Sequence, residues 1–185
     1  MKVLGISGSL RRDSHNAELL RAAALQLPPA VELELWEGLK AVPPYDADDD
    51  AGEPRPWILR NLDQAIRDSD AVLFSTPEYN HSIPGQLKNT LDWLSRPLAT
   101  TPLKGKPVAV VGASTGLFGA VWAQAELRKV LGAMGADVVD RELPVGQASD
   151  AFTAEGRLAD EDLTLILSDL LAELIGAGRE AAVAA

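Results

Sequence analysis

Polar side chains concentrate in three short segments that each follow or close an apolar run of the chain. The first segment, GSLRRDSHN, covers residues 8–16 and comes after the apolar run 3–6. The second, PEYNHSIPG, covers residues 77–85 and follows the run 71–75, and the third, GASTGLFG, covers residues 112–119 and overlaps the end of the run 108–113. Short apolar runs bounded by turn residues are typical of strands covered on both faces. We therefore expect each polar segment at the end of a buried strand.

The first segment has the residue types of a phosphate site. Ser9, Ser14 and Asn16 can donate hydrogen bonds, Arg11 is a permanent cation, and a helix that begins beside them adds the partial positive charge of its N-terminus. The segment lacks the G-x-x-x-x-G-K-[ST] of a P-loop and the G-x-G-x-x-G of a dinucleotide fingerprint. This pattern favours a mononucleotide phosphate. Taken alone, the segment is also compatible with a serine-capped helix beside two solvated arginines.

The second segment suits recognition of the polar edge of a flat heterocycle. Pro77 restricts the backbone on both of its sides, and Pro84 and Gly85 end the segment in a turn. Between them lies a dense set of hydrogen-bonding residues: Glu78, Tyr79, Asn80, His81 and Ser82. For His81, a catalytic role and a solvent-facing loop position both remain open.

The remaining pattern predicts an α/β domain. Val31, Leu33 and Leu35 alternate with glutamates, which indicates an edge strand, and a fifth strand is expected within residues 136–143. Leucine-rich stripes with helical spacing separate the strands. Strands that alternate with helices form an open parallel sheet with helices on both faces. Ligands of such a sheet bind beyond the carboxyl ends of the strands, where the three polar segments would meet.

Length and composition narrow the possible functions. The 185 residues, 46% of them hydrophobic and without a long apolar run, predict one soluble domain over residues 1–178 with a frayed tail at 179–185. The short apolar opening favours a cytoplasmic location. With no cysteine and two histidines, disulfides, thiolate chemistry and cysteine- or histidine-rich metal sites are excluded. The net charge of −10 opposes nonspecific binding to nucleic acid or anionic membranes. Any redox chemistry requires a bound cofactor.

Together these motifs resemble the NADPH-dependent FMN reductase family, in particular its quinone and chromate reductase branch. The resemblance rests on GSLR at 8–11, PEYN-x-S-x-P-G-x-LKN-x-x-DWLSR at 77–96 and G-x-S-x-G-x-x-G at 112–119, and it covers nearly the whole chain in element order. It implies a flavodoxin-like, doubly wound, five-stranded parallel sheet in the order 2-1-3-4-5. It also implies FMN as the bound cofactor and NADPH or NADH as the electron donor.

The resemblance further implies which residues bind the cofactor. The FMN phosphate would be held by the first segment through Ser9, Arg11, Ser14 and Asn16. The flavin ring would lie on the second segment, at Pro77, Glu78, Tyr79, Asn80 and Ser82, and Ser114 and Gly116 of the third segment would close its other side. The flavin carries the chemistry in such enzymes, so no catalytic side chain and no metal ligand is assigned.

The implied function is hydride passage from NADPH or NADH through bound FMN to a quinone or another small acceptor. Members of this branch are generally dimers or tetramers, so a homodimer or homotetramer is expected. Relatives often have an arginine where this chain has Trp122, and in some of them that arginine belongs to a contact between subunits near the flavin. This difference leaves open the choice between dimer and tetramer and the way in which the nicotinamide is held. Trp122 itself is expected in the core or at an interface.

Two other functions fit part of the sequence. An acidic FMN domain of this size could be a non-enzymatic electron carrier, although Arg11 and the long second segment favour the reductase. Residues 112–116 also satisfy the G-x-S-x-G pattern of a serine hydrolase with Ser114 as nucleophile. A hydrolase triad places its histidine after the serine, whereas His15 and His81 both precede Ser114. The physiological acceptor and the choice between NADPH and NADH stay open.

Overall fold

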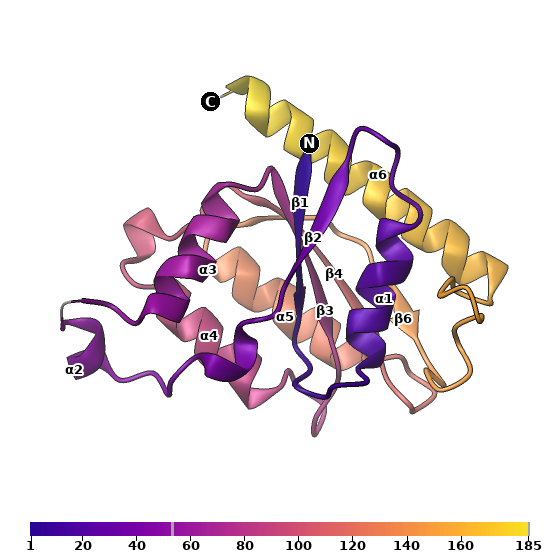
Figure 1. Ribbon diagram of the computed structural model, residues 1–185, viewed down its shortest axis with the longest axis horizontal. Coiled ribbons are helices and arrows are strands. Elements are labelled where there is room, and N and C mark those ends of the chain that lie inside the picture. Colours follow the sequence, from indigo (N-terminus) through magenta and orange to yellow (C-terminus); the bar gives the residue numbers. More distant parts are fainter. Residues whose placement is uncertain (53, 185) are drawn as a thin grey trace.

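The computed structural model describes residues 1–52 and 54–184, in which a central parallel sheet lies between two layers of helices (Figure 1). Its main path has the strand order β2-β1-β3-β4-β5, as the resemblance implies. The strands are β1 (Lys2–Ser7), β2 (Glu32–Trp36), β3 (Ala71–Thr76), β4 (Pro107–Ala113), β5 (Asp137–Val138) and β6 (Pro144–Val145). The flavodoxin-like doubly wound fold predicted from the sequence is therefore confirmed.

Helices cover both faces of the sheet. They are α1 (His15–Ala24), α2 (Ala47–Asp50), α3 (Trp57–Arg67), α4 (Gly85–Leu94), α5 (Val121–Ala133) and α6 (Glu161–Ala184), with short 3-10 helices at Leu39–Ala41 and Leu98–Thr100. One apolar cluster joins α1 and α6 to the sheet, and a second joins α3, α4 and α5 to its other face. No helix of the described residues combines the length and the apolar character needed to cross a membrane.

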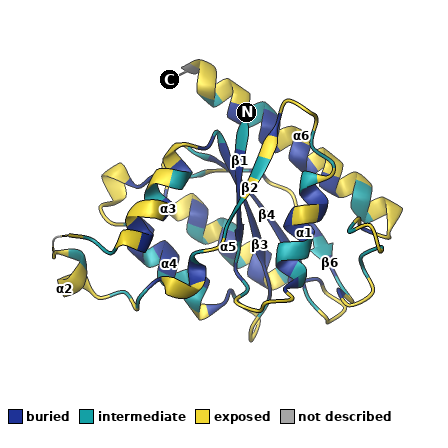
Figure 2. Cartoon of the chain, viewed as in Figure 1, coloured by how far each residue is buried: buried dark blue, intermediate teal, exposed yellow. Residues whose placement is uncertain are grey.

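The central strands are apolar throughout because both of their faces are covered. In β3, Leu73 belongs to the cluster under α1 and α6, whereas Val72 and Phe74 belong to the cluster under α3, α4 and α5. Every residue of β3 and β4 is buried, and Figure 2 shows these strands in dark blue between helices whose outer faces are exposed. Edge strand β2 has exposed glutamates at alternate positions, as its period-2 pattern predicts.

The fifth strand, β5, lies within residues 136–143 as expected from the sequence, and a sixth short strand, β6, follows it. β5 pairs with Pro107–Val108 of β4, and β6 pairs with Gly112–Ala113 farther along the same strand. Between them the exposed residues 140–142 leave the ladder. The buried Gln124 side chain bonds the backbone of Leu143, donating to its carbonyl at 3.1 Å and accepting from its N–H at 3.2 Å. The sheet consequently has six strands instead of five.

A frayed tail is expected from the sequence at residues 179–185, but helix α6 extends over residues 179–184. Residue 185 lies outside the described residues. Gly178 allows this helix to approach the sheet closely. A Cβ at this position would lie 2.3 Å from Cε of Met1 and 3.3 Å from the carbonyl oxygen of Asp70. The approach brings the last turns of α6 against the amino ends of β1 and β3.

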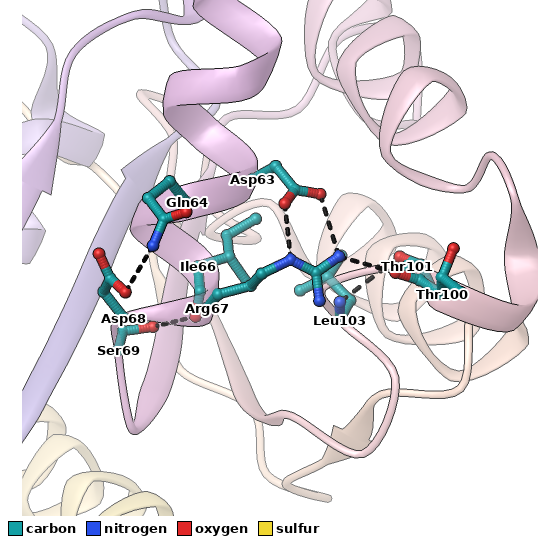
Figure 3. Close-up of polar contacts among 9 residues, drawn as sticks. All are labelled: Asp63, Gln64, Ile66, Arg67, Asp68, Ser69, Thr100, Thr101 and Leu103. Atoms are coloured by element: carbon teal, nitrogen blue, oxygen red, sulfur yellow. Dashed lines mark hydrogen bonds and ion pairs between the residues drawn. The ribbon is translucent and has the colours of Figure 1, made fainter.

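A polar cluster surrounds Arg67, the last residue of α3, near the amino ends of β3 and β4 (Figure 3). Its Nε donates to Oδ2 of Asp63 at 2.7 Å, and its Nη2 donates to the carbonyl of Thr100 at 2.8 Å. The segment after α4 is thereby tied to α3. This cluster lies at the edge of the sheet opposite the three polar segments.

The third polar segment is held in place by backbone contacts with residues 144–148. The N–H of Ser114 donates to the Val145 carbonyl at 3.0 Å, and the N–H of Gln147 donates to the Gly116 carbonyl at 2.9 Å. Gly119 has φ +54, and a Cβ there would lie 2.2 Å from the carbonyl carbon of Pro144. The two backbones therefore meet where a side chain has no room.

We expect Gly119→Ala to destabilise the fold for two separate reasons. The left-handed backbone costs about 1–2 kcal/mol for a residue with a Cβ, and the clash with Pro144 adds about 1–3 kcal/mol. The matched control is Gly156→Ala, because Gly156 has φ +75 but a Cβ there would meet no atom within 4 Å. Urea unfolding should show a larger loss for Gly119→Ala, and equal losses would mean that the close approach has no energetic weight.

Candidate functional site

The three polar segments meet at a small cavity beyond the carboxyl ends of β1, β3 and β4. This cavity, here named the loop cavity, has a volume of about 130 Å³. Its walls are Ser9, Arg11, Ser14, His15, Asn16, Pro77, Glu78, Tyr79, Ala113, Ser114 and Thr115. In Figure 1 the segments after β1 and β3 lie together at the lower edge of the sheet. The strand order changes direction between β1 and β3, where ligands of doubly wound sheets bind.

The start of α1 offers hydrogen-bond donors to this cavity. Ser14 is the N-cap residue, and its Oγ accepts from the N–H of Ala17 at 3.2 Å, which leaves the hydroxyl proton free to donate. Among the described residues, the backbone N–H groups of His15 and Asn16 donate no hydrogen bond. Arg11 is exposed at the same wall and forms no ion pair within the described part of the chain. Uncompensated donors and a cation at a helix N-terminus suit an anion.

Asn16 is buried, with 3% of its surface exposed, and its side chain makes three hydrogen bonds. Its Nδ2 donates to the Ala113 carbonyl at 2.9 Å. Its Oδ1 accepts from Oγ of Ser75 at 2.9 Å and from the Ala113 N–H at 3.0 Å. Asn16 thus ties the start of α1 to the ends of β3 and β4, and its backbone N–H can donate to a ligand.

The second segment forms a short β-hairpin whose loop has two residues. The N–H of Tyr79 donates to the Ser82 carbonyl at 2.9 Å, and the N–H of Ser82 donates back at 3.1 Å. Asn80 and His81 form the turn with φ of 52° and 60°, the positive values that a type I′ turn requires. Because Asn80 and His81 occupy the exposed tip, only Pro77, Glu78 and Tyr79 of this segment line the loop cavity. Asn80 and Ser82 lie outside its wall.

Glu78 joins the second segment to helix α5. Its Oε2 accepts from the N–H of Trp122 at 3.1 Å and from the N–H of Ala123 at 3.2 Å. The N-cap residue of α5, Ala120, has no side chain that could make these bonds. A carboxylate at a helix N-terminus satisfies free N–H groups and opposes the positive end of the helix dipole. The Glu78 carboxylate is therefore a brace between two loops.

The third segment brings Ser114 and Thr115 to the loop cavity, whereas Gly116 lies outside its wall. The Gly116 carbonyl accepts the bond from Gln147 that anchors the segment. Within the described residues, no hydrogen bond joins Oγ of Ser114 to a histidine, although a hydrolase nucleophile needs such a base. The geometry gives no support to the hydrolase.

Three wall residues, His15, Ala113 and Thr115, are not among the site residues expected from the sequence. All three lie inside the polar segments, next to assigned residues, so their position along the chain was the available signal. Phe152 approaches from a distant loop and stacks on the His15 ring, with centroids 6.5 Å apart and ring planes 6° apart. Nothing in the local sequence pattern indicates that contact.

Exposed aromatic side chains lie next to the loop cavity. Phe118 and Trp122 are 63% and 43% exposed, and their ring centroids are 5.1 Å apart. The His81 ring meets the Trp122 ring edge-on at 4.8 Å, and Leu117 and Tyr79 are also exposed. We name Tyr79, Leu117, Phe118 and Trp122 the aromatic patch. Of the two positions expected for Trp122 from the sequence, the core is thus wrong.

Comparisons with known proteins agree with this geometry. The sequence profile of the NADPH-dependent FMN reductases matches residues 1–150. An NAD(P)H-dependent FMN reductase of Pseudomonas aeruginosa is 42% identical over 175 residues, which cover 94% of this chain and 93% of that protein. A quinone reductase of Escherichia coli is 38% identical over 141 residues, 76% of this chain and 74% of that protein. The structure of FerB, a flavoenzyme NAD(P)H:(acceptor) oxidoreductase from Paracoccus denitrificans, has a TM-score of 0.84 at 34% identity and 97% coverage of both chains.

We expect Asn16→Ala to reduce stability even without a ligand. The substitution leaves the buried Ser75 hydroxyl and the Ala113 N–H and carbonyl without their partner, and each unsatisfied group costs about 1–3 kcal/mol. Urea unfolding of the ligand-free protein measures the loss. The control Asn61→Ala removes an exposed asparagine that accepts a bond from Trp36, and it should cost much less. An Asn16→Ala protein of unchanged stability would refute the role as a brace.

Proposed function

This chain belongs to the NADPH-dependent FMN reductase family, and on that premise we propose that it takes electrons from NADPH or NADH and passes them through FMN to a quinone or another small acceptor. The observation that carries the proposal is the meeting of the three polar segments at the loop cavity. Relatives named as FMN reductase and quinone reductase support both the cofactor and the class of acceptor.

The residues of the loop cavity fit FMN. A dianionic phosphate would meet Arg11, the Ser14 hydroxyl and the free N–H groups of His15 and Asn16, with Ser9 beside them. Backbone N–H groups at a helix start suit a phosphate without a glycine-rich loop. We propose that Ser9, Arg11, Ser14 and the backbone of Asn16 hold the phosphate of FMN.

The flat ring would lie between the second and third segments. Pro77, Glu78 and Tyr79 offer one wall, and Ser114 and Thr115 offer the other. In this arrangement Asn80 and Ser82 shape the hairpin, and Gly116 anchors the third segment through its carbonyl, so we propose supporting roles for these three residues. This distribution refines the cofactor-binding set expected from the sequence.

FMN, when bound, supplies a ring that can accept and donate hydride. The protein orients this ring and sets the charge around it. Among the described residues, the backbone N–H groups of Thr115 and Gly116 donate no hydrogen bond, so they can stabilise negative charge at the ring edge. The Glu78 carboxylate is held by α5. We propose that no side chain of the chain acts as an acid or a base.

An anaerobic titration tests the proposed function. FMN-loaded protein should lose its visible flavin absorbance when about one equivalent of NADPH or NADH is added and regain it when a benzoquinone follows. Bound flavin that neither donor reduces would instead identify an electron carrier. A protein that binds no flavin would contradict the whole proposal.

We also propose that the chain forms a homo-oligomer and that it acts in the cytoplasm, where its nicotinamide donors are. The aromatic patch supports the first point, because large apolar side chains that cluster at the surface mark interaction sites. Its position beside the loop cavity would bring a second copy close to the flavin.

We expect Arg11→Ala to weaken FMN binding about 10- to 100-fold, because a charge-assisted bond to phosphate is worth about 1.5–3 kcal/mol. Fluorescence titration of the ligand-free protein with FMN measures the change. Arg60→Ala removes the same charge from an exposed position on α3 and should leave FMN affinity unchanged. Equal affinities of the Arg11 variant and the unmodified protein would reject the phosphate assignment.

Trp122→Glu should shift the oligomer toward monomer, because a carboxylate would be placed in an apolar contact. Size-exclusion chromatography with light scattering reports the mass. The control is Trp57→Glu, since Trp57 is 66% exposed on α3, away from the patch. Monomeric unmodified protein, or a Trp122→Glu protein of unchanged mass, would contradict the interface.

A further inference from the structure

A second cavity opens on the other side of the first polar segment. It lies between the start of α1 and the carboxyl end of β2 and has a volume of about 320 Å³, within the range of about 300–1,000 Å³ that small-molecule sites occupy. The cations Arg11, Arg12, Arg21 and Lys40 line it, and we name it the basic cavity. None of the proposed flavin-ring residues of the second and third segments contributes to its wall.

The charge of the basic cavity is opposite to that of the molecule. The chain has a net charge of −10, yet four cations share this cavity with Glu37 as the only carboxylate among the described lining residues. Within the described part of the chain, none of the four cations forms an ion pair. Clustered like charges repel one another unless an anion lies between them. The cavity therefore suits a ligand with phosphate groups.

The wall of the basic cavity also has an apolar part, which includes Trp36 and Leu39. Two contacts fix the indole of Trp36. Its Nε1 donates to Oδ1 of Asn61 at 2.8 Å, and a Cβ at Gly38 would lie 2.3 Å from its ring, so that the ring packs directly on the Gly38 backbone. A fixed aromatic residue and a group of cations around one cavity match a phosphorylated nucleotide, whose base is flat and whose phosphates are anionic.

The basic cavity borders the loop cavity. Ser9, Arg11 and Ser14 line both, and Arg11 together with Tyr79 also lines a third cavity of about 350 Å³ at the start of α4. A long ligand that reaches the ring-binding walls near Tyr79 can thus extend past Arg11 into the basic cavity. The electron donor of the proposed function is such a ligand.

We propose that the basic cavity binds the adenosine end of NADPH and that Arg12, Arg21 and Lys40 recognise its 2′-phosphate. This inference rests on the proposed function and adds a donor preference to it: NADPH is used better than NADH, which lacks this phosphate. Glu37 opposes the phosphate but is outnumbered by the cations. Adenine lies against the apolar wall at Trp36.

The test uses FMN-loaded protein and two probes. Adenosine 2′,5′-bisphosphate should bind at least about 10-fold more tightly than adenosine 5′-phosphate in calorimetric titrations, since each charge-assisted bond contributes roughly that factor or more. In the double variant Arg21→Gln/Lys40→Gln, the bisphosphate should lose this advantage. The KM for NADPH should rise about 10- to 100-fold while the KM for NADH changes less than about threefold.

Two single variants sharpen the test. Glu37→Gln removes the opposing carboxylate and should lower the KM for NADPH. Arg60→Gln removes one positive charge on α3, as Arg21→Gln and Lys40→Gln each do in the basic cavity. It should leave the ratio of the KM for NADPH to the KM for NADH unchanged. Because Arg21, Lys40 and Glu37 are all exposed, these substitutions should not prevent folding, which unfolding curves check.

The inference is overturned if the two probes bind equally, if the double variant raises both KM values by the same factor, or if it releases FMN, which would assign the cavity to the flavin phosphate. A Glu37→Gln protein that loses NADH instead would assign Glu37 to a ribose hydroxyl and also overturn the inference. In each of these cases both donors still reduce the flavin of the unmodified protein. Failure of the proposed function is distinct, because then neither donor reduces the flavin at all.

Discussion

The site depends on one buried polar side chain, Asn16, which connects three elements of the fold. Its amide bonds the end of β4 through both backbone groups of Ala113 and bonds the end of β3 through Ser75. Asn16 is also the second residue of α1, so the same bonds fix the position of that helix start. Hydrogen bonds in a dry interior are costly to leave unmade. The N-terminal end of α1 is therefore held at a fixed place relative to the two central strands.

The other two segments are braced in a similar way. Glu78 links the hairpin after β3 to α5, and the close approach of Gly119 to Pro144 links the loop after β4 to β6. In both cases a contact between distant residues holds a loop in place. A flavin site needs such rigidity, because the reactive cofactor is held mainly by backbone groups whose positions set its orientation.

The charge is unevenly distributed at the end of the sheet where the three polar segments meet. The molecule as a whole is acidic, but the start of α1 is positive on two sides, toward the loop cavity and toward the basic cavity. Arg11 lies at the boundary between them. A phosphate on each side of the first segment is consistent with an enzyme that holds a mononucleotide cofactor and receives a dinucleotide donor. The apolar surface at Trp122 lies on the side of the hairpin and α5.

The sequence by itself determined the buried strands, the helices between them and the three polar segments, because periodicity and turn residues act over a few neighbouring positions. It also determined the family, since the motifs at 8–11 and 77–96 are local strings. The tertiary structure alone decided which distant positions meet: Asn16 bonds Ala113, 97 residues apart, Glu78 bonds α5, and Lys40 and Arg21 line one cavity. It also decided the bonds of Gln124 to the backbone of Leu143, just before the sixth strand. Such pairs are set by how helices pack across the sheet, and no local pattern encodes that packing.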